Sequence, residues 1–167
     1  MCSSGVAPSI KPFNTMISAY GQDQKLNRAV EMFNKASPFG VPLDENTYMN
    51  LIGYYGGKAG RMLKASHCFS KMQGDEIKPG RVSYDIMVNV YANIGVLHDA
   101  KKLFQVMQRQ GCLADSFTYL SLIQAYTRRL NYSKAEETIH TMERIGILPS
   151  CSHSTFYNVY PYLNKCL

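Results

Sequence analysis

The chain has 167 residues, of which 46% are apolar, and a formal net charge of +6 at pH 7, which favours a polyanionic partner. It contains no run of 18 apolar residues, so we expect no transmembrane helix and no membrane partner. Its five cysteines lie far apart without a Cys-x-x-Cys motif, which argues against a disulfide framework and against a structural metal site.

Internal similarity at a period of about 35 residues divides the chain into predicted repeats. The whole repeats span residues 10–44, 45–80, 81–115 and 116–150. Residues 1–9 match the end of a preceding repeat, and residues 151–167 match the first helix of a following one. We therefore expect this chain to be a fragment of a longer array.

Each repeat opens with large apolar positions spaced i, i+3, i+4 and i+7, which places them on one face of a helix. These positions are Phe13, Met16, Ile17 and Tyr20; Tyr48, Leu51, Ile52 and Tyr55; Tyr84, Met87, Val88 and Tyr91; and Tyr119, Leu122, Ile123 and Tyr126. We expect these aromatic side chains to pack in the core and not to form a stacking surface for bases.

A second apolar stripe follows in each repeat, with alanine at its centre. The alanines are Ala29, Ala65, Ala100 and Ala135. Small side chains at one register allow two helices to approach closely, and glycine or proline near the repeat ends terminates the second helix. The sequence therefore predicts an all-α fold of stacked helix-turn-helix repeats, each of which completes its core against its neighbours.

Several motifs resemble the pentatricopeptide repeat family. They are the opening Phe13-Asn14-Thr15-Met16-Ile17, the turn Lys58-Ala59-Gly60-Arg61 and the repeat end Gly146-Ile147-Leu148-Pro149. Repeat lengths near 35 are similar to the P-class of the family, and the chain has no tryptophan, unlike the tetratricopeptide signature. The resemblance implies a right-handed α-solenoid that binds single-stranded RNA in a chloroplast or mitochondrion, for RNA processing, stability or translation, with no cofactor and no small-molecule substrate.

In this family the fifth residue of the first helix and the last residue of the repeat together read one base. The resemblance thus assigns base reading to Asn14 with Asp44, Met49 with Gly80, Asp85 with Asp115, and Leu120 with Ser150. Asparagine with aspartate is the family's pair for uracil. The pairs with Met49 and Leu120 are expected to be indifferent to base identity. The two acids of the third repeat must meet a donor, which would suit an amino-bearing edge such as that of guanine.

The resemblance also implies supporting contacts. The second residue of each repeat wedges against a base, which assigns Lys11, Asn46, Val82 and Phe117. A basic residue after the first helix meets the RNA backbone, which assigns Lys58 and Arg128 to phosphate contacts.

Two alternatives remain open from the sequence. Helical repeats also bind proteins, and Met49 and Leu120 on a concave face would suit an apolar peptide or protein partner. The histidines and paired carboxylates show no spacing typical of metal ligands or of a catalytic base, so we expect no enzyme in this chain. An enzymatic domain elsewhere in a longer protein would be invisible here.

Overall fold

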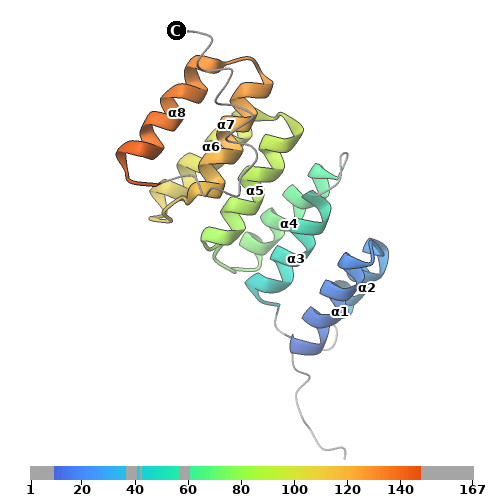
Figure 1. Cartoon of the computed structure of the whole chain (residues 1–167). Helices are drawn as coiled ribbons and strands as arrows, with labels where there is room; N and C mark the ends of the chain where they lie inside the picture. Colours follow the sequence, from blue (N-terminus) through green and yellow to red (C-terminus); the bar gives the residue numbers. More distant parts are fainter. Residues whose placement is uncertain (1–9, 37–40, 42, 57–60, 148–167) are drawn as a thin grey trace, which may run out of the picture. The chain divides into compact units, whose positions relative to one another are not determined.

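The structure is a computed structural model that describes residues 10–36, 41, 43–56 and 61–147 (Figure 1). Within these residues the chain forms only α-helices and turns. The helices are α1 (Ile10–Gln22), α2 (Leu26–Ala36), α3 (Glu45–Gly56), α4 (Met62–Gly74), α5 (Arg81–Ile94), α6 (Leu97–Arg109), α7 (Ser116–Arg128) and α8 (Tyr132–Arg144). None of these helices is long and apolar enough to cross a membrane.

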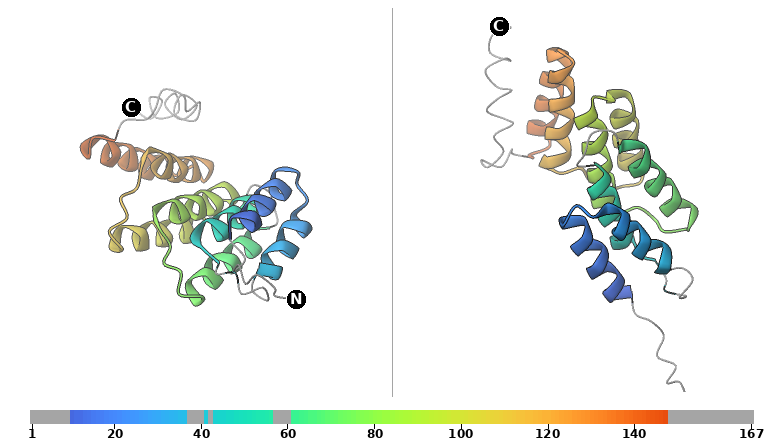
Figure 2. Two further views of the ribbon diagram at one scale, coloured as in Figure 1. Left: turned by 90° about the horizontal axis from the view of Figure 1, so that it is seen from below. Right: turned by 90° about the vertical axis from the view of Figure 1, so that its right-hand side faces the viewer.

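Consecutive helices pack in pairs as hairpins: α1 with α2, α3 with α4, α5 with α6 and α7 with α8. Each hairpin falls inside one of the predicted repeats, whose boundaries stay a prediction. The chain divides into two compact units, Met1–Pro79 and Gly80–Leu167. In the first unit α1 packs on α3, and in the second α5 packs on α7, so that successive hairpins stack through their first helices (Figure 2).

The centre of each hairpin is closely packed, as the alanine register predicts. The four alanines of this register, Ala29, Ala65, Ala100 and Ala135, are completely buried. The predicted core role of the first-helix stripe is also confirmed at most positions. Phe13, Tyr20 and Tyr91 are half-buried, and Met16 is exposed at 49%, whereas the matching Leu51, Met87 and Leu122 are buried.

Edge-to-face aromatic pairs join successive hairpins. Phe33 of α2 meets Tyr48 of α3 with ring centroids 5.1 Å apart, and Phe104 of α6 meets Tyr119 of α7 at 5.4 Å. The Tyr48 hydroxyl also donates a hydrogen bond to Asp75, beyond the end of α4. Burial, this bond and the negative charge of Asp75 raise the pKa of Tyr48. The aromatic stripe therefore belongs to the core, where such pairs add roughly 0.5–1.5 kcal/mol each beyond their buried area.

Residues with positive φ follow the ends of both first and second helices of the hairpins. After second helices, Gly111 and Gly146 have positive φ, and Glu76 takes the same position in the second repeat. The next residue donates its N–H back to the helix, as from Cys112 to the Met107 carbonyl oxygen at 3.1 Å, which is the Schellman pattern. The expected glycine termination is thus confirmed at Gly111 and Gly146, while Glu76 adopts a conformation that glycine favours.

Helices α1 and α3 approach closely at Gly21. A Cβ atom placed on Gly21 would lie 1.9 Å from the ring of Tyr54. The ring is held there because the Tyr54 hydroxyl donates to the Ser18 carbonyl oxygen at 2.9 Å. The absence of a side chain at Gly21 therefore sets how closely these two first helices stack.

Candidate functional site

The predicted reading pair of the first repeat forms one hydrogen-bonded cluster, here called the Asn14 cluster: Asn14, Asp44 and Thr47. Asp44 precedes α3 and caps its N-terminus, because its Oδ1 accepts from the Thr47 backbone N–H at 2.9 Å. Asn14 of α1 donates from Nδ2 to Asp44 Oδ1 at 3.2 Å. The Thr47 hydroxyl lies 2.5 Å from Asn14 Oδ1 and 2.6 Å from Asp44 Oδ1, and its single proton serves one of them at a time.

Asp44 orients the Asn14 amide. Burial by itself raises the pKa of Asp44, but hydrogen bonds from Thr47 and Asn14 outweigh it and hold the pKa below its ordinary value. An ionised carboxylate can only accept, so the amide nitrogen of Asn14, and not its oxygen, must face Asp44. The half-buried Asn14 keeps one N–H and one oxygen lone pair for a ligand, which is a directional donor–acceptor pair.

The third repeat carries a related cluster with an added arginine, here called the Asp85 cluster: Asp85, Asp115, Thr118 and Arg81. Asp115 caps α7 by accepting from the Thr118 backbone N–H at 3.1 Å. The Thr118 hydroxyl donates to Asp85 Oδ1, as the Thr47 hydroxyl does toward Asn14. The structure therefore brings Asp85 and Asp115 together, as the family register implies.

Arg81 supplies the donor that these two acids require. Its Nη1 lies 3.3 Å from Asp85 Oδ2 and also donates to Asp115 Oδ2. The Asp85 side chain is only 8% exposed, whereas those of Arg81 and Asp115 are 46% and 43% exposed. The donor that the two acids require therefore comes from the chain itself. An amino-bearing base edge is not needed to fill that role.

The two acids differ in their ionisation. Burial, and then the charge of Asp115, raise the pKa of Asp85 against the opposing effects of Thr118 and Arg81. For Asp115 burial also acts to raise the pKa, but the Thr118 backbone and the Arg81 guanidinium outweigh it and hold the pKa below its ordinary value. The exposed acid of the cluster is therefore the more readily ionised one.

The remaining reading positions differ from this arrangement. In the predicted pair of Met49 and Gly80, Gly80 lies at the N-cap of α5, where no side chain makes a capping hydrogen bond. Met49 is half-buried and belongs to the first compact unit, whereas Gly80 begins the second. Leu120 is 3% exposed, so the expectation that it offers an apolar concave surface is wrong. Ser150 and Lys58 lie outside the described residues.

The wedge and phosphate positions lie at the surface. Lys11, Asn46, Val82 and Phe117 are all exposed. Arg128 has an internal contact, since its Nη1 donates to the Asn93 carbonyl oxygen at 2.8 Å and so ties α7 to the end of α5. Its other N–H groups leave capacity for a phosphate.

Sequence reasoning missed Arg81 and the two threonines. A hydroxyl residue recurs three positions after the end of a repeat, at Thr47, Ser83 and Thr118. This recurrence is a sequence signal for the capping and bridging role. Arginine stands at the first position of the third repeat alone among the four, so no periodic signal pointed to it.

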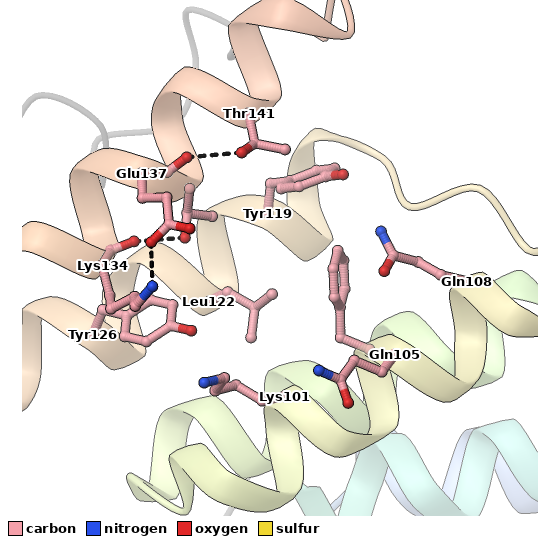
Figure 3. Close-up of a pocket in the computed structure, with 11 residues that line it drawn as sticks. Lys101, Gln105, Gln108, Tyr119, Leu122, Tyr126, Lys134, Glu137 and Thr141 are labelled. Atoms are coloured by element: carbon pink, nitrogen blue, oxygen red, sulfur yellow. Dashed lines mark hydrogen bonds and ion pairs between the residues drawn. The ribbon is translucent and has the colours of Figure 1, made fainter.

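A separate groove of about 270 Å³ lies between α6 and α8, with side chains of α7 between them (Figure 3). Lys101 Nζ of α6 lies 5.9 Å from the centre of the Tyr126 ring. On α8, which forms the opposite wall, Lys134 and Glu137 form an ion pair. The groove contains none of the predicted reading residues. It therefore does not contribute to the candidate site.

Models of repeat families match the chain over most of its length. A model described as PPR repeat matches residues 12–36 and 117–147, one described as PPR repeat family matches 79–128, and one described as pentatricopeptide repeat domain matches 31–94. In Arabidopsis thaliana, a chloroplastic pentatricopeptide repeat-containing protein is 28% identical over 84% of this chain and 15% of its own length. A mitochondrial one is 22% identical over 95% of this chain and 26% of its own length.

Solved structures show the same fold. Pentatricopeptide repeat protein PPR10, in complex with an 18-nt psaJ RNA element, matches with a TM-score of 0.77 and 20% identity over 94% of this chain and 22% of that one. The PPR domain of Arabidopsis thaliana protein-only RNase P 1, in complex with tRNA, matches with a TM-score of 0.71 and 15% identity over 94% of this chain and 88% of that one. The predicted all-α solenoid of stacked hairpins is confirmed. The chain spans less than half the length of the curated relatives it matches.

Proposed function

This chain belongs to the pentatricopeptide repeat family, and from that premise we propose that it binds single-stranded RNA with one base per repeat. The proposed setting is RNA processing, stability or translation in a chloroplast or mitochondrion. Relatives named as chloroplastic and mitochondrial support this setting, and the RNA complexes of PPR10 and of the RNase P repeat domain support the ligand. The proposed role of this segment is binding, and catalysis is not assigned to it.

The Asn14 cluster is the observation that carries the proposal. Uracil presents an N–H between two carbonyl oxygens on its Watson–Crick edge. The free Asn14 oxygen lone pair can accept from that N–H, while the remaining Asn14 N–H donates to a neighbouring carbonyl oxygen. Because Asp44 and Thr47 hold the amide in one orientation, it is prepared for this edge before RNA arrives.

Surface residues support the same ligand. Val82 and Phe117 are exposed apolar side chains at the predicted wedge positions, and stacking on such side chains contributes roughly 1–3 kcal/mol per base. The formal net charge of +6 favours a phosphate backbone. We expect modest affinity for poly(U), weaker binding to duplex, and a loss of affinity with salt as counterions are released.

Replacement of the reading side chain tests the proposal. In the Asn14→Thr variant we expect the base preferred at one nucleotide to move from uracil to guanine, because threonine with aspartate is the family's pair for guanine. Fluorescence anisotropy with short uridine tracts that carry one guanosine at each position in turn measures the change. Asn34→Thr, on the exposed face of α2, is the matched control and should leave the preference unchanged.

Two outcomes would contradict the proposal. Either no single strand of poly(U), poly(A), poly(C) or poly(G) binds at low salt, or Asn14→Thr leaves the uracil preference untouched. In both cases a scaffold that binds a protein partner would be the better description. Circular dichroism of the variants separates these outcomes from a loss of folding.

A further inference from the structure

The third repeat cannot read a base as the first does. Each oxygen of the Asp85 carboxylate accepts an internal hydrogen bond, from the Thr118 hydroxyl on one side and from Arg81 Nη1 on the other. The side chain is 8% exposed. A ligand in solution therefore meets very little of Asp85, although Asp85 occupies the predicted reading position.

Arg81 takes over the role that the amide of Asn14 has in the first repeat. Asn14 Nδ2 donates to the capping Asp44, and Arg81 Nη1 donates to the capping Asp115. The charge of the site is preserved as well. Asn14 and Asp44 carry one negative charge together, and the two acids of the Asp85 cluster with Arg81 also sum to one negative charge.

The open space beside the Asp85 cluster is bordered by Arg81 and Asp115 but not by Asp85. An arginine has five N–H donors in a planar fork, and its bonds to both acids use those on Nη1. Within the described part of the chain, Nε and Nη2 remain for a ligand. The two carboxylates hold the fork in place, so it can act as a rigid pair of donors.

We propose that Arg81 is the base-contacting residue of the third repeat and selects a base with two adjacent acceptors. This inference rests on the proposed binding of single-stranded RNA. Guanine offers such a pair at O6 and N7, and cytosine offers one at N3 and O2. In uracil an N–H lies between the carbonyl oxygens and opposes a donor fork, and in adenine each ring acceptor at a readable edge adjoins the amino group.

The test uses the full chain and short uridine tracts that carry one central guanosine, cytidine or adenosine. For the wild type, central guanosine or cytidine should strengthen binding by at least about fivefold over uridine and adenosine, the lower range for a bidentate arginine contact. Comparison of the guanosine and cytidine tracts identifies the edge that is read. Arg81→Lys keeps the positive charge but loses the fork, so it should abolish the discrimination while retaining most of the affinity.

Arg109→Lys, at an exposed position of α6, is the matched control and should retain the discrimination. Circular dichroism checks that each variant is folded. The inference is overturned if central uridine or adenosine binds as well as guanosine and cytidine, or if Arg81→Lys still discriminates. If the uracil preference that depends on Asn14 is still observed, either of these results overturns the role of Arg81 alone. Absence of binding to every tract at low salt overturns the proposed function too.

Discussion

At the scale of residues, both clusters use the same frame. In each, an aspartate caps the first helix of the next repeat and accepts from the preceding first helix: Asp44 from Asn14, and Asp115 from Arg81. A threonine three residues after the cap donates its backbone N–H to that aspartate, and its hydroxyl lies against Asn14 in one cluster and Asp85 in the other. What differs is the residue inside this frame. Asn14 is neutral and half-buried, whereas Asp85 is acidic and buried, and needs Arg81 as a partner.

The ionisation of Asp85 has a consequence for stability. Burial raises its pKa in the folded state, so the folded chain holds this proton more tightly than the unfolded chain does. This contribution to stability is fully present below the ordinary aspartate pKa and is lost as the pH rises through the raised pKa. Asp44 and Asp115, whose pKa values are lowered, contribute above their ordinary pKa and lose that contribution as the pH falls through the lowered one.

We therefore expect Asp85→Asn to stabilise the chain at neutral pH, by about 0.5–1.5 kcal/mol, the net contribution of one hydrogen bond. The new amide would donate to Asp115 as Asn14 does to Asp44. The loss of the Asp85 charge costs little, because the Arg81 guanidinium is half-exposed and keeps Asp115 as its partner. Urea unfolding at pH 7 and at pH 4 measures the effect, which should shrink at pH 4. Asp23→Asn, in an exposed ion pair, is the control. If Asp85→Asn instead destabilised the chain at pH 7, the pair with Arg81 would contribute more to stability than the burial of the Asp85 charge costs.

At the scale of elements, the hairpins depend on a few close approaches between helices. The central alanines bring the two helices of each hairpin together, and Gly21 brings α1 onto α3. In the part of the chain that the structure describes, a glycine in the left-handed region ends the hairpins of α6 and α8, and Glu76 takes that position after α4. Substitutions at these points should therefore act through helix spacing and not through helix propensity.

Gly21→Ala tests this expectation. Alanine favours a helix over glycine by up to about 1 kcal/mol, but its Cβ would overlap the Tyr54 ring, and overpacking typically costs about 1–3 kcal/mol. We expect a net loss of stability. Gly53→Ala is a matched control, since nothing lies within 4 Å of its Cβ and the position is exposed, so it should stabilise α3. Equal melting temperatures for the two variants would show that α1 and α3 are not held at this spacing.

At the scale of the whole molecule, the described contacts run between sequence neighbours. Within each compact unit, the hairpins meet through their first helices and through an aromatic pair, Phe33–Tyr48 in one and Phe104–Tyr119 in the other. Stability in such an array is close to a sum of terms for each repeat and for each contact between neighbours. The two compact units fit this description, because each contains its own stacked hairpins.

Removal of residues 116–167 should accordingly lower the melting temperature and leave a helical remainder. The truncation removes α7 and α8 and exposes the face of α5 on which α7 packs, but it leaves the contacts among α1, α2, α3 and α4 intact. Circular dichroism during thermal unfolding measures both effects. A truncated chain without helix would contradict the coupling between neighbours.

The sequence by itself determined the all-α class, the hairpin repeat and the register of the candidate site. These follow from helical periodicity, which is a local property of the chain, and from a 35-residue spacing that superimposes Asn14 and Asp44 on a family pattern. The closeness of that pair was predictable from the stacking of first helices. Asp44 caps α3, α3 stacks on α1, and α1 carries Asn14.

Only the tertiary structure decided what each side chain at that register can do. Asp85 and Leu120 hold the same register position as Asn14 but are buried, and Arg81 reaches a capping acid 34 positions away. The exposure of Met16 likewise departs from its stripe. Burial and the choice of a hydrogen-bond partner depend on which segments of neighbouring repeats cover a position. Such segments are distant in the chain, so periodicity carries no information about them.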